Sequence, residues 1–228
     1  MVVTAEVARV RGGSLAAHGR AFATHPTPWA LAGLVAAFAG VRSFLGPPRW
    51  TDLAAFATVV ALEPFIEWVV HSKVLHAKPM EVLGRPVELS AAKGHRLHHE
   101  EPTNLELVFV PPWVLVYLAP GLTLTLFGLL GPAHLAATTL ATGAAVLLAY
   151  EWTHYLIHTT YRPRSRAFRR QWRHHRLHHY RNEGYWFGVT TAISDVVLGT
   201  GPRAADVPVS PTARPRPVAP AQEIKALR

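Results

Sequence analysis

The sequence predicts an all-α integral membrane protein, built as a four-helix transmembrane bundle with a cytosolic helical cap. The chain has 228 residues, of which 50% are hydrophobic and only 16% are charged, whereas about a quarter of the residues of a soluble domain are charged. Four apolar segments approach the length of about 20 residues that crosses a bilayer. Basic residues cluster after the second and fourth of these segments, and a chain of this length is expected to form one domain.

The four apolar segments run from about 28–45, 51–71, 107–130 and 134–157. A turn at Pro47–Pro48 separates the first pair, and Gly131–Pro132 separates the second pair. Pro111, Pro112 and the Pro120–Gly121 pair are expected to kink or divide the third segment, because proline removes a helical hydrogen bond. A soluble bundle of very apolar helices is the alternative, but such long segments with few charges are uncommon in soluble cores.

The distribution of basic residues predicts the orientation. Five Lys or Arg residues lie in the loop after the second segment and eight Arg residues follow the fourth, whereas the two turns hold only Arg49. The positive-inside rule therefore places the loop, both termini and the C-terminal region in the cytoplasm. The net charge of +9 fits this orientation. Nucleic-acid binding is not expected, because the Arg cluster is interleaved with histidines and has no recognisable binding fold.

The composition also divides the chain. Residues 1–26 are expected to form a cytoplasmic lead-in, since no apolar core with a cleavage site follows their charges. Residues 27–200 form the main domain, and the Pro-rich residues 201–228 are expected to be a disordered tail. The chain has no Cys, which excludes disulfides, thiolate metal sites and Cys nucleophiles. A metal would need His, Asp, Glu or backbone oxygen as ligands.

Ten of the 14 histidines form four spaced groups that all lie at or just beyond one predicted membrane face. The groups are His71 and His76; His95, His98 and His99; His154 and His158; and His175, His178 and His179. Residues three and four apart are neighbours on a helix, so an H-x2-H-H triplet aims three imidazoles at one region. Ten imidazoles are too many for one ion and enough for two, and they suit iron, zinc, copper or nickel. We therefore predict a dinuclear metal site in the cap.

A pH switch or a haem site would account for the histidines less well. A pH switch would not require these spacings, and a haem would need only two axial histidines. His71 and His76 are five apart, and an ideal helix would rotate them by about 140° relative to each other. Either the helix deforms before His76 or the two rings serve different metals.

Three carboxylates are candidates for orienting the metal-bound imidazoles from behind. They are Glu67, Glu151 and Asp195. Glu67 could instead be a solvated residue at the interface. Glu151 also forms a Glu-x-x-His pair with His154, as in carboxylate-bridged di-iron bundles, although we favour an orienting role.

The four groups, read as H-S-K-V-L-H, H-R-L-H-H, H-Y-L-I-H and H-R-L-H-H, resemble the fatty acid hydroxylase / sterol desaturase superfamily. The segment from Tyr185 to Thr200 resembles the C-terminal signature of that family. The resemblance extends from about Glu63 to Thr200, and the fatty acid 2-hydroxylase branch is the most similar. It implies two iron ions, which zinc can replace in purified protein, with the ten grouped histidines as ligands and residues 27–200 as the catalytic domain.

The resemblance implies a monooxygenase that hydroxylates a lipid with O2. We see no nucleotide-binding glycine motif and no Cys for an iron–sulfur cluster, so electrons are expected from a separate donor, a ferredoxin or a cytochrome b5-like protein with its reductase. A lipid desaturase or a carotenoid hydroxylase on the same site remains an alternative. A membrane metal-binding or transport protein is a further alternative, but its ligands would lie near the bilayer midplane between broken helices.

Overall fold

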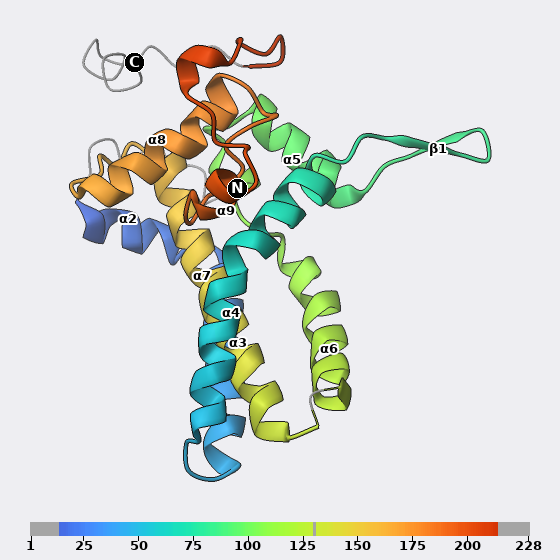
Figure 1. The fold of residues 1–228 in the computed structure, drawn as a ribbon, viewed down its shortest axis with the longest axis vertical. Helices are drawn as coiled ribbons and strands as arrows, with labels where there is room; N and C mark the ends of the chain where they lie inside the picture. The colour runs from blue at the N-terminus through green and yellow to red at the C-terminus, as the bar shows by residue number, and fades with distance from the viewer. Residues whose placement is uncertain (1–13, 130, 214–228) are drawn as a thin grey trace. The chain divides into compact units, whose positions relative to one another are not determined.

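The computed structural model describes residues 14–129 and 131–213, and this part of the chain is mostly helical (Figure 1). It divides into two compact units. The first, here called the helix unit, comprises Met1–Glu63 and Phe109–Leu156, and the second, the histidine unit, comprises Pro64–Val108 and Ile157–Arg228. Two of the three boundaries fall inside the long helices α4 and α7, and the third falls just before α6. Each unit is therefore made of two separate stretches of the chain.

The helix unit contains the apolar helices. These are α2 (Leu15–Phe22), α3 (Pro26–Phe44), most of α4 (Trp50–Val69), α6 (Pro112–Leu129) and most of α7 (Ala133–His158). Within the described residues, three segments are long and apolar enough to cross a membrane, namely Trp50–Leu75, Leu105–Leu129 and Ala133–His158. The expected fourth crossing is not confirmed: α3 has 19 residues, but it is rich in Gly and Ala and carries Arg42 in its last turn.

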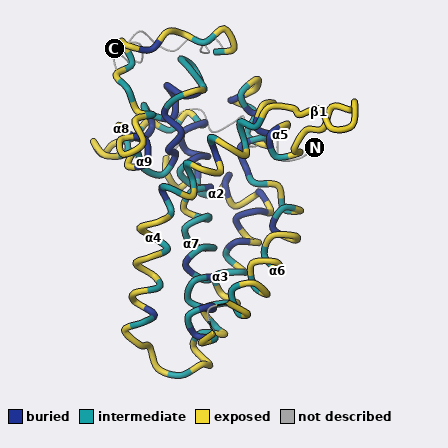
Figure 2. Tube along the Cα trace, turned by 45° about the vertical axis from the view of Figure 1, so that its right-hand side comes forward, coloured by how far each residue is buried: buried dark blue, intermediate teal, exposed yellow. Residues whose placement is uncertain are grey.

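The surface of these helices supports a membrane setting. Only 6% of the most apolar window of Trp50–Leu75 and 17% of that of Leu105–Leu129 are buried inside the protein. Figure 2 shows long exposed stretches on α4 and α6, where large apolar side chains such as Leu53, Val116 and Leu124 are exposed. An apolar surface of this extent requires a lipid or protein cover.

The prolines of the third segment do not divide it. Pro112 is the first residue of α6, where a missing N–H costs nothing, and α6 continues through Pro120 to Leu129. The short 3₁₀ turn η2 (Leu105–Leu107) precedes it and is capped by Asn104, whose side chain accepts from the N–H of Glu106.

The histidine unit holds the remaining elements. The end of α4 continues into a π-helix, η1 (Val70–Leu75), which is followed by an antiparallel hairpin of β1 (Met80–Val82) and β2 (Arg85–Val87) and by α5 (Ser90–Glu100). After α7 come α8 (Arg166–Tyr180), α9 (Ile193–Val197) and the 3₁₀ turn η3 (Ala204–Asp206). α5 packs against both η1 and η2.

The first part of the expected tail is ordered. Val207 is buried in a small core with Leu177 and Trp186, and Arg181 donates to the carbonyl of Val207 at 2.8 Å. Residues 201–213 thus contact the rest of the histidine unit through Val207 and Ala204 and through hydrogen bonds to the carbonyls of Val207 and Pro202. Residues 214–228, and residues 1–13 of the predicted lead-in, lie outside the described part of the chain.

Candidate metal centre

The π-helix η1 explains the five-residue spacing of the first histidine pair. An α-helix would turn His71 and His76 to different sides, but the wider turn of a π-helix places residues about five apart on one face. The N–H of His76 bonds to the carbonyl of His71 at 3.2 Å, which is the i→i+5 bond of such a turn. Of the two alternatives raised by the sequence, the helix deforms, and the two rings face the same centre.

The first histidine group gathers five side chains from three elements. Its members are His71, His76, His95, His99 and His178. Four of them form a closed ring in which successive Nε2 atoms, in the order 95, 76, 178 and 99, are 3.1 Å apart. The fifth, His71, places its Nε2 3.0 Å from that of His95. A square with this edge has a centre about 2.2 Å from each corner, close to the usual metal–imidazole distance of about 2.1 Å.

The second histidine group consists of five buried side chains, His98, His154, His158, His175 and His179. One ligand atom of each lies within 4.8 Å of those of the others. The Nε2 atoms of His175 and His179 are 3.0 Å apart, and the His98 ring lies 4.5 Å from that of His158. His154 precedes His158 by four residues on the continuous helix α7.

The two triplets are each divided between the groups. On α5, His95 and His99 belong to the first group and His98 to the second, whereas on α8 His175 and His179 belong to the second and His178 to the first. The groups are neighbours: the rings of His99 and His179 are stacked with centroids 4.1 Å apart. All ten histidines that the sequence singled out therefore lie in two adjacent groups.

Burial favours the neutral form of four of these imidazoles. It lowers the pKa of His76 to about 4. For His95, His178 and His179, burial first and the neighbouring imidazoles second lower the pKa well below its ordinary value. Neutral imidazole is the form that binds a metal, so the groups are ready for ligation at neutral pH.

Backbone carbonyls fix which ring nitrogen faces the centre. The Nδ1 atoms of His71, His178 and His158 lie 2.5, 2.8 and 2.8 Å from the carbonyl oxygens of Phe187, Tyr185 and Pro102, respectively. A carbonyl can only accept, so each Nδ1 carries the proton and each Nε2 of the neutral ring carries a lone pair. His71 and His178 therefore aim lone pairs at the first group, where the Nε2 atoms converge at 3.0–3.1 Å, and a donor set of this kind fits a bound metal. No pattern in the sequence indicates these three carbonyls.

The carboxylates of Glu67 and Asp195 hold the segment that supplies one of these carbonyls. Asp195 accepts from the N–H groups of Phe187 and Gly188 at 3.0 and 2.7 Å, and Glu67 accepts from the N–H of Val189 and from the hydroxyl of Thr190. Gly188 is required at this point: a Cβ there would lie 2.0 Å from the carbonyl oxygen of Thr191 and 3.0 Å from Asp195 Oδ2.

Asp195 also contacts two side chains, His174 at 2.8 Å and Thr200 at 2.6 Å. Burial alone would raise the pKa of Asp195, but hydrogen bonds from His174, Thr200 and the N–H of Gly188 outweigh it and hold the pKa below its ordinary value. The buried carboxylate is therefore ionised at neutral pH and works as a fixed acceptor.

Glu151 has a different place. Its carboxylate is fully buried and accepts from the N–H of Val110 at 3.1 Å within the helix unit. Neither Glu151 nor Glu67 nor Asp195 belongs to either histidine group. Two histidines of the helix unit that belong to neither group have other partners. His25 caps α3 by accepting from the N–H of Thr27, and His134 contacts the hydroxyl of Thr51 at 3.2 Å.

Comparison with known proteins gives a consistent result. The profile described as Fatty acid hydroxylase matches residues 56–200. Dihydroceramide fatty acyl 2-hydroxylase FAH2 of Arabidopsis thaliana is 34% identical over 116 residues, which are 47% of this chain and 45% of that protein. Ceramide very long chain fatty acid hydroxylase SCS7 of Saccharomyces cerevisiae is 32% identical over 118 residues, which are 51% of this chain and 29% of that protein.

The solved structure titled "Full length scs7p (only hydroxylase domain visible)" superposes with a TM-score of 0.67 and 26% identity, over 81% of this chain and 68% of that one. The chain spans about half or less of the length of the curated relatives it matches. The family profile, however, covers more than half of this chain and includes all four histidine groups of the sequence. The chain therefore belongs to the fatty acid hydroxylase family.

Proposed function

We propose that this chain is a membrane-bound di-iron monooxygenase that hydroxylates a lipid with O2 and electrons from a separate donor. The observation that carries the proposal is the pair of adjacent groups of five imidazoles. The relatives are named as hydroxylases of fatty acyl chains and ceramides, which favours a fatty acyl or related lipid as the substrate here. The exposed apolar helices suit a substrate that arrives from the bilayer.

Each histidine group would hold one ion. Each group offers five imidazole donors, more than the four ligands of a typical zinc site, which supports iron as the working metal. Zinc could still occupy the site in purified protein, because its affinity for such ligands exceeds that of ferrous iron.

The iron pair, when bound, supplies the redox chemistry that activates O2 and places one of its oxygen atoms into a C–H bond of the lipid. The side chains of the protein bind and orient the metals and exclude water. Phe187 lies with its ring 5.6, 5.9 and 5.4 Å from the rings of His71, His76 and His178, and it shields the first group with an apolar surface. Glu67 and Asp195 act as positioning residues through the Phe187 segment.

The finer topology is part of the proposal. With α3 as a fourth crossing, both termini and the loops that follow His71 and His158 would share one face, and the basic residues in those loops favour the cytoplasm for that face. The electron donor would then be a cytosolic or membrane-anchored carrier, such as a ferredoxin or a cytochrome b5-like protein with its reductase. Residues 27–200 would form the catalytic domain.

The test is lipid profiling of cells that express the chain under oxygen-18, compared with cells that express His98→Ala or His178→Ala, one from each group. We expect a hydroxylated lipid that carries the label with the parent chain and not with either variant. His134→Ala, which lies outside both groups, should keep the product. An unlabelled lipid with a new double bond would identify a desaturase instead. A labelled carotenoid would identify a carotenoid hydroxylase. Unchanged lipids in all cells, together with altered cellular metal content, would favour metal binding or transport.

A further inference from the structure

The hairpin of β1 and β2 extends from the rest of the histidine unit with no described residue covering it. Every residue from Met80 to Ser90 is exposed, and Figure 1 shows the two strands reaching away from α5. A two-stranded hairpin is at best marginally stable alone in water. Its stability therefore depends on what its two faces contact.

The register of the strands separates the two faces. Met80 lies opposite Val87 and Val82 opposite Arg85, whereas Glu81 lies opposite Pro86. Opposed residues share a face and neighbouring residues alternate, so Met80, Val82, Arg85 and Val87 form one face, here called the apolar face. The only acidic residue of the paired strands, Glu81, lies on the other face.

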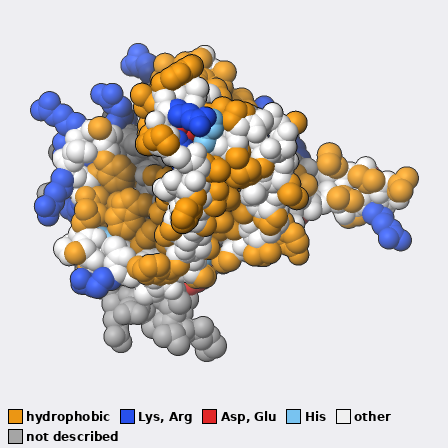
Figure 3. All heavy atoms as spheres, turned by 90° about the horizontal axis from the view of Figure 1, so that it is seen from below, with side chains coloured by type: hydrophobic (Ala, Val, Ile, Leu, Met, Phe, Trp, Pro, Cys, Tyr) orange, Lys and Arg blue, Asp and Glu red, His pale blue; other side chains and the backbone are white. Residues whose placement is uncertain are grey.

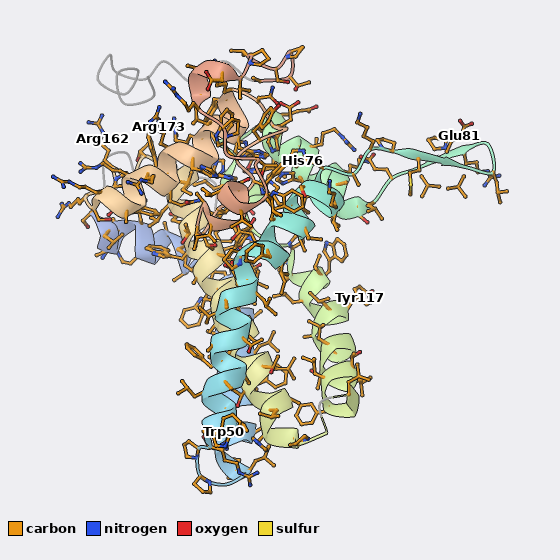
Figure 4. The ribbon with its side chains drawn as sticks, in the orientation of Figure 1. Trp50, His76, Glu81, Tyr117, Arg162 and Arg173 are labelled. Carbon is orange, nitrogen blue, oxygen red and sulfur yellow. The ribbon has the colours of Figure 1, made fainter. Side chains whose placement is uncertain are left out.

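The apolar face is large for so small an element. Its side chains Met80, Val82 and Val87 are 59%, 46% and 44% exposed. Figure 3 views the hairpin from one side and shows hydrophobic and basic groups there with no acidic group, and Figure 4 labels Glu81 on the projecting strands.

The turn at the tip of the hairpin contains a leucine, Leu83, at a position that leucine rarely occupies. Leu83 and Gly84 both have positive φ, 51° and 71°, as the two central residues of a type I′ turn require. Asn or Gly usually occupies the first of these positions, because a leucine there is strained. Leu83 is nevertheless 98% exposed, so neither turn geometry nor internal packing accounts for it.

The chain itself brings this hairpin to a bilayer surface. The candidate span Trp50–Leu75 ends five residues before Met80, and five residues reach at most about 17 Å. The exposed cations Lys78 and Arg85 would meet phosphate headgroups. Glu81 faces away from them, and the other acidic residue of the anchor, Glu88, is paired with Arg96 of α5, which leaves the charge separation that an interfacial element needs. The stem of Arg85 can lie along the apolar face with its head at the phosphates.

We propose that residues 80–89 are an interfacial anchor that inserts Leu83 and the apolar face into the lipid surface at which the Trp50–Leu75 span ends. The anchor lies between η1 and α5, which begins at Ser90 and carries three of the ten histidines. It fixes the start of α5 at the membrane surface. The anchor does not depend on the identity of the metal or on the reaction.

The test uses the absence of Cys from the chain, which lets one introduced thiol carry a fluorophore at a single place. Leu83→Cys is labelled in the full chain in nanodiscs, and Glu81→Cys, on the opposite face of the same hairpin, is the matched control. We expect the label at 83 to be quenched several-fold more by brominated acyl chains, and several-fold less by aqueous iodide, than the label at 81. Its emission should also be shifted to shorter wavelength.

Equal access of iodide to both labels would overturn the proposal. A label at 83 that is protected from iodide but not quenched by brominated lipid would also overturn it, because a protein surface, such as a partner or a second copy of the chain, would then cover the apolar face. Val87→Cys gives a second reading on the apolar face if replacing Leu83 disturbs the turn. Circular dichroism and the unfolding temperature of each labelled protein show that the fold is retained.

Discussion

Replacing Gly188 by Ala tests the link between the Phe187 segment and the metal centre. The added Cβ would lie 2.0 Å from the carbonyl oxygen of Thr191, so one of the two must move by roughly 1 Å or more to reach an ordinary contact. The carboxylate of Asp195, 3.0 Å from the same Cβ, blocks a second direction. A shift of the segment would displace the carbonyl of Phe187, which lies 2.5 Å from Nδ1 of His71.

Two magnitudes follow for Gly188→Ala. Overpacking of this kind costs about 1–3 kcal/mol, which lowers the unfolding temperature of a chain of this size by roughly 2–12 °C. A displacement of about 1 Å at a catalytic centre can cost on the order of 100-fold in rate. We therefore expect a large loss of lipid hydroxylation with reduced metal content, measured by product analysis and by elemental analysis of the purified protein.

Gly94→Ala is the matched control. Gly94 lies in α5 directly before His95, and a Cβ there would meet nothing within 4 Å. Alanine is favoured over glycine within a helix by about 1 kcal/mol, so this variant should keep both its metal and its activity with an equal or higher unfolding temperature. If Gly188→Ala behaves like Gly94→Ala in all three measurements, the Phe187 segment does not position His71 and the reasoning is refuted.

Three further predictions use other parts of the histidine unit. Asp195→Asn keeps the shape of the side chain but replaces a carboxylate oxygen that accepts a hydrogen bond with an amide that donates one. It should lower the free energy of unfolding by about 1.5–3 kcal/mol. An unchanged unfolding temperature by scanning fluorimetry would contradict this. His76→Ala should leave about half of the parent metal content by elemental analysis, whereas complete loss would mean that the groups do not bind independently. Burial raises the pKa of Glu183, but hydrogen bonds from Thr212 and Ser210 outweigh it and lower the pKa. The stability that Glu183 gives the 207–213 segment is therefore full above the ordinary carboxylate pKa, and it is lost as the pH falls through the pKa of Glu183 in the folded protein. Proteolysis of this segment should accelerate on acidification. Glu183→Ala should remove this pH dependence.

The sequence predicted which histidines come together better than how they are arranged. The ten histidines could be found because three- and four-residue spacings place side chains on one helical face. The same argument treated each H-x2-H-H triplet as aimed at one region, whereas the structure sends His95 and His99 to one group and His98 to the other. On a helix, residue i+4 points in nearly the same direction as residue i, whereas residue i+3 points somewhat further away. Because the two groups lie side by side, this small difference in angle decides which group each histidine joins.

The remaining differences have local causes that sequence patterns do not encode. No amino-acid composition distinguishes a π-helix from an α-helix. The spacing of His71 and His76 therefore indicated only that the helix deforms or that the two rings serve different metals. The carbonyls that orient the imidazoles belong to the backbone of Pro102, Tyr185 and Phe187, and any residue type could supply them. The contacts of 201–213 come from Val207 and Ala204 in a small core and from hydrogen bonds with Trp186 and Glu183, which a Pro-rich composition does not reveal.

The division of the triplets means that some helices supply ligands to one group and others supply ligands to both. The π-helix η1 contributes only to the first group and α7 only to the second, but α5 and α8 each contribute to both. The stacked rings of His99 and His179 join the groups directly. A change confined to η1 can therefore disturb one ion, whereas any shift of α5 or α8 must disturb both. If a variant that displaces α5 without replacing a histidine removed metal from one group alone, the two helices could not be the shared frame that their ligands indicate.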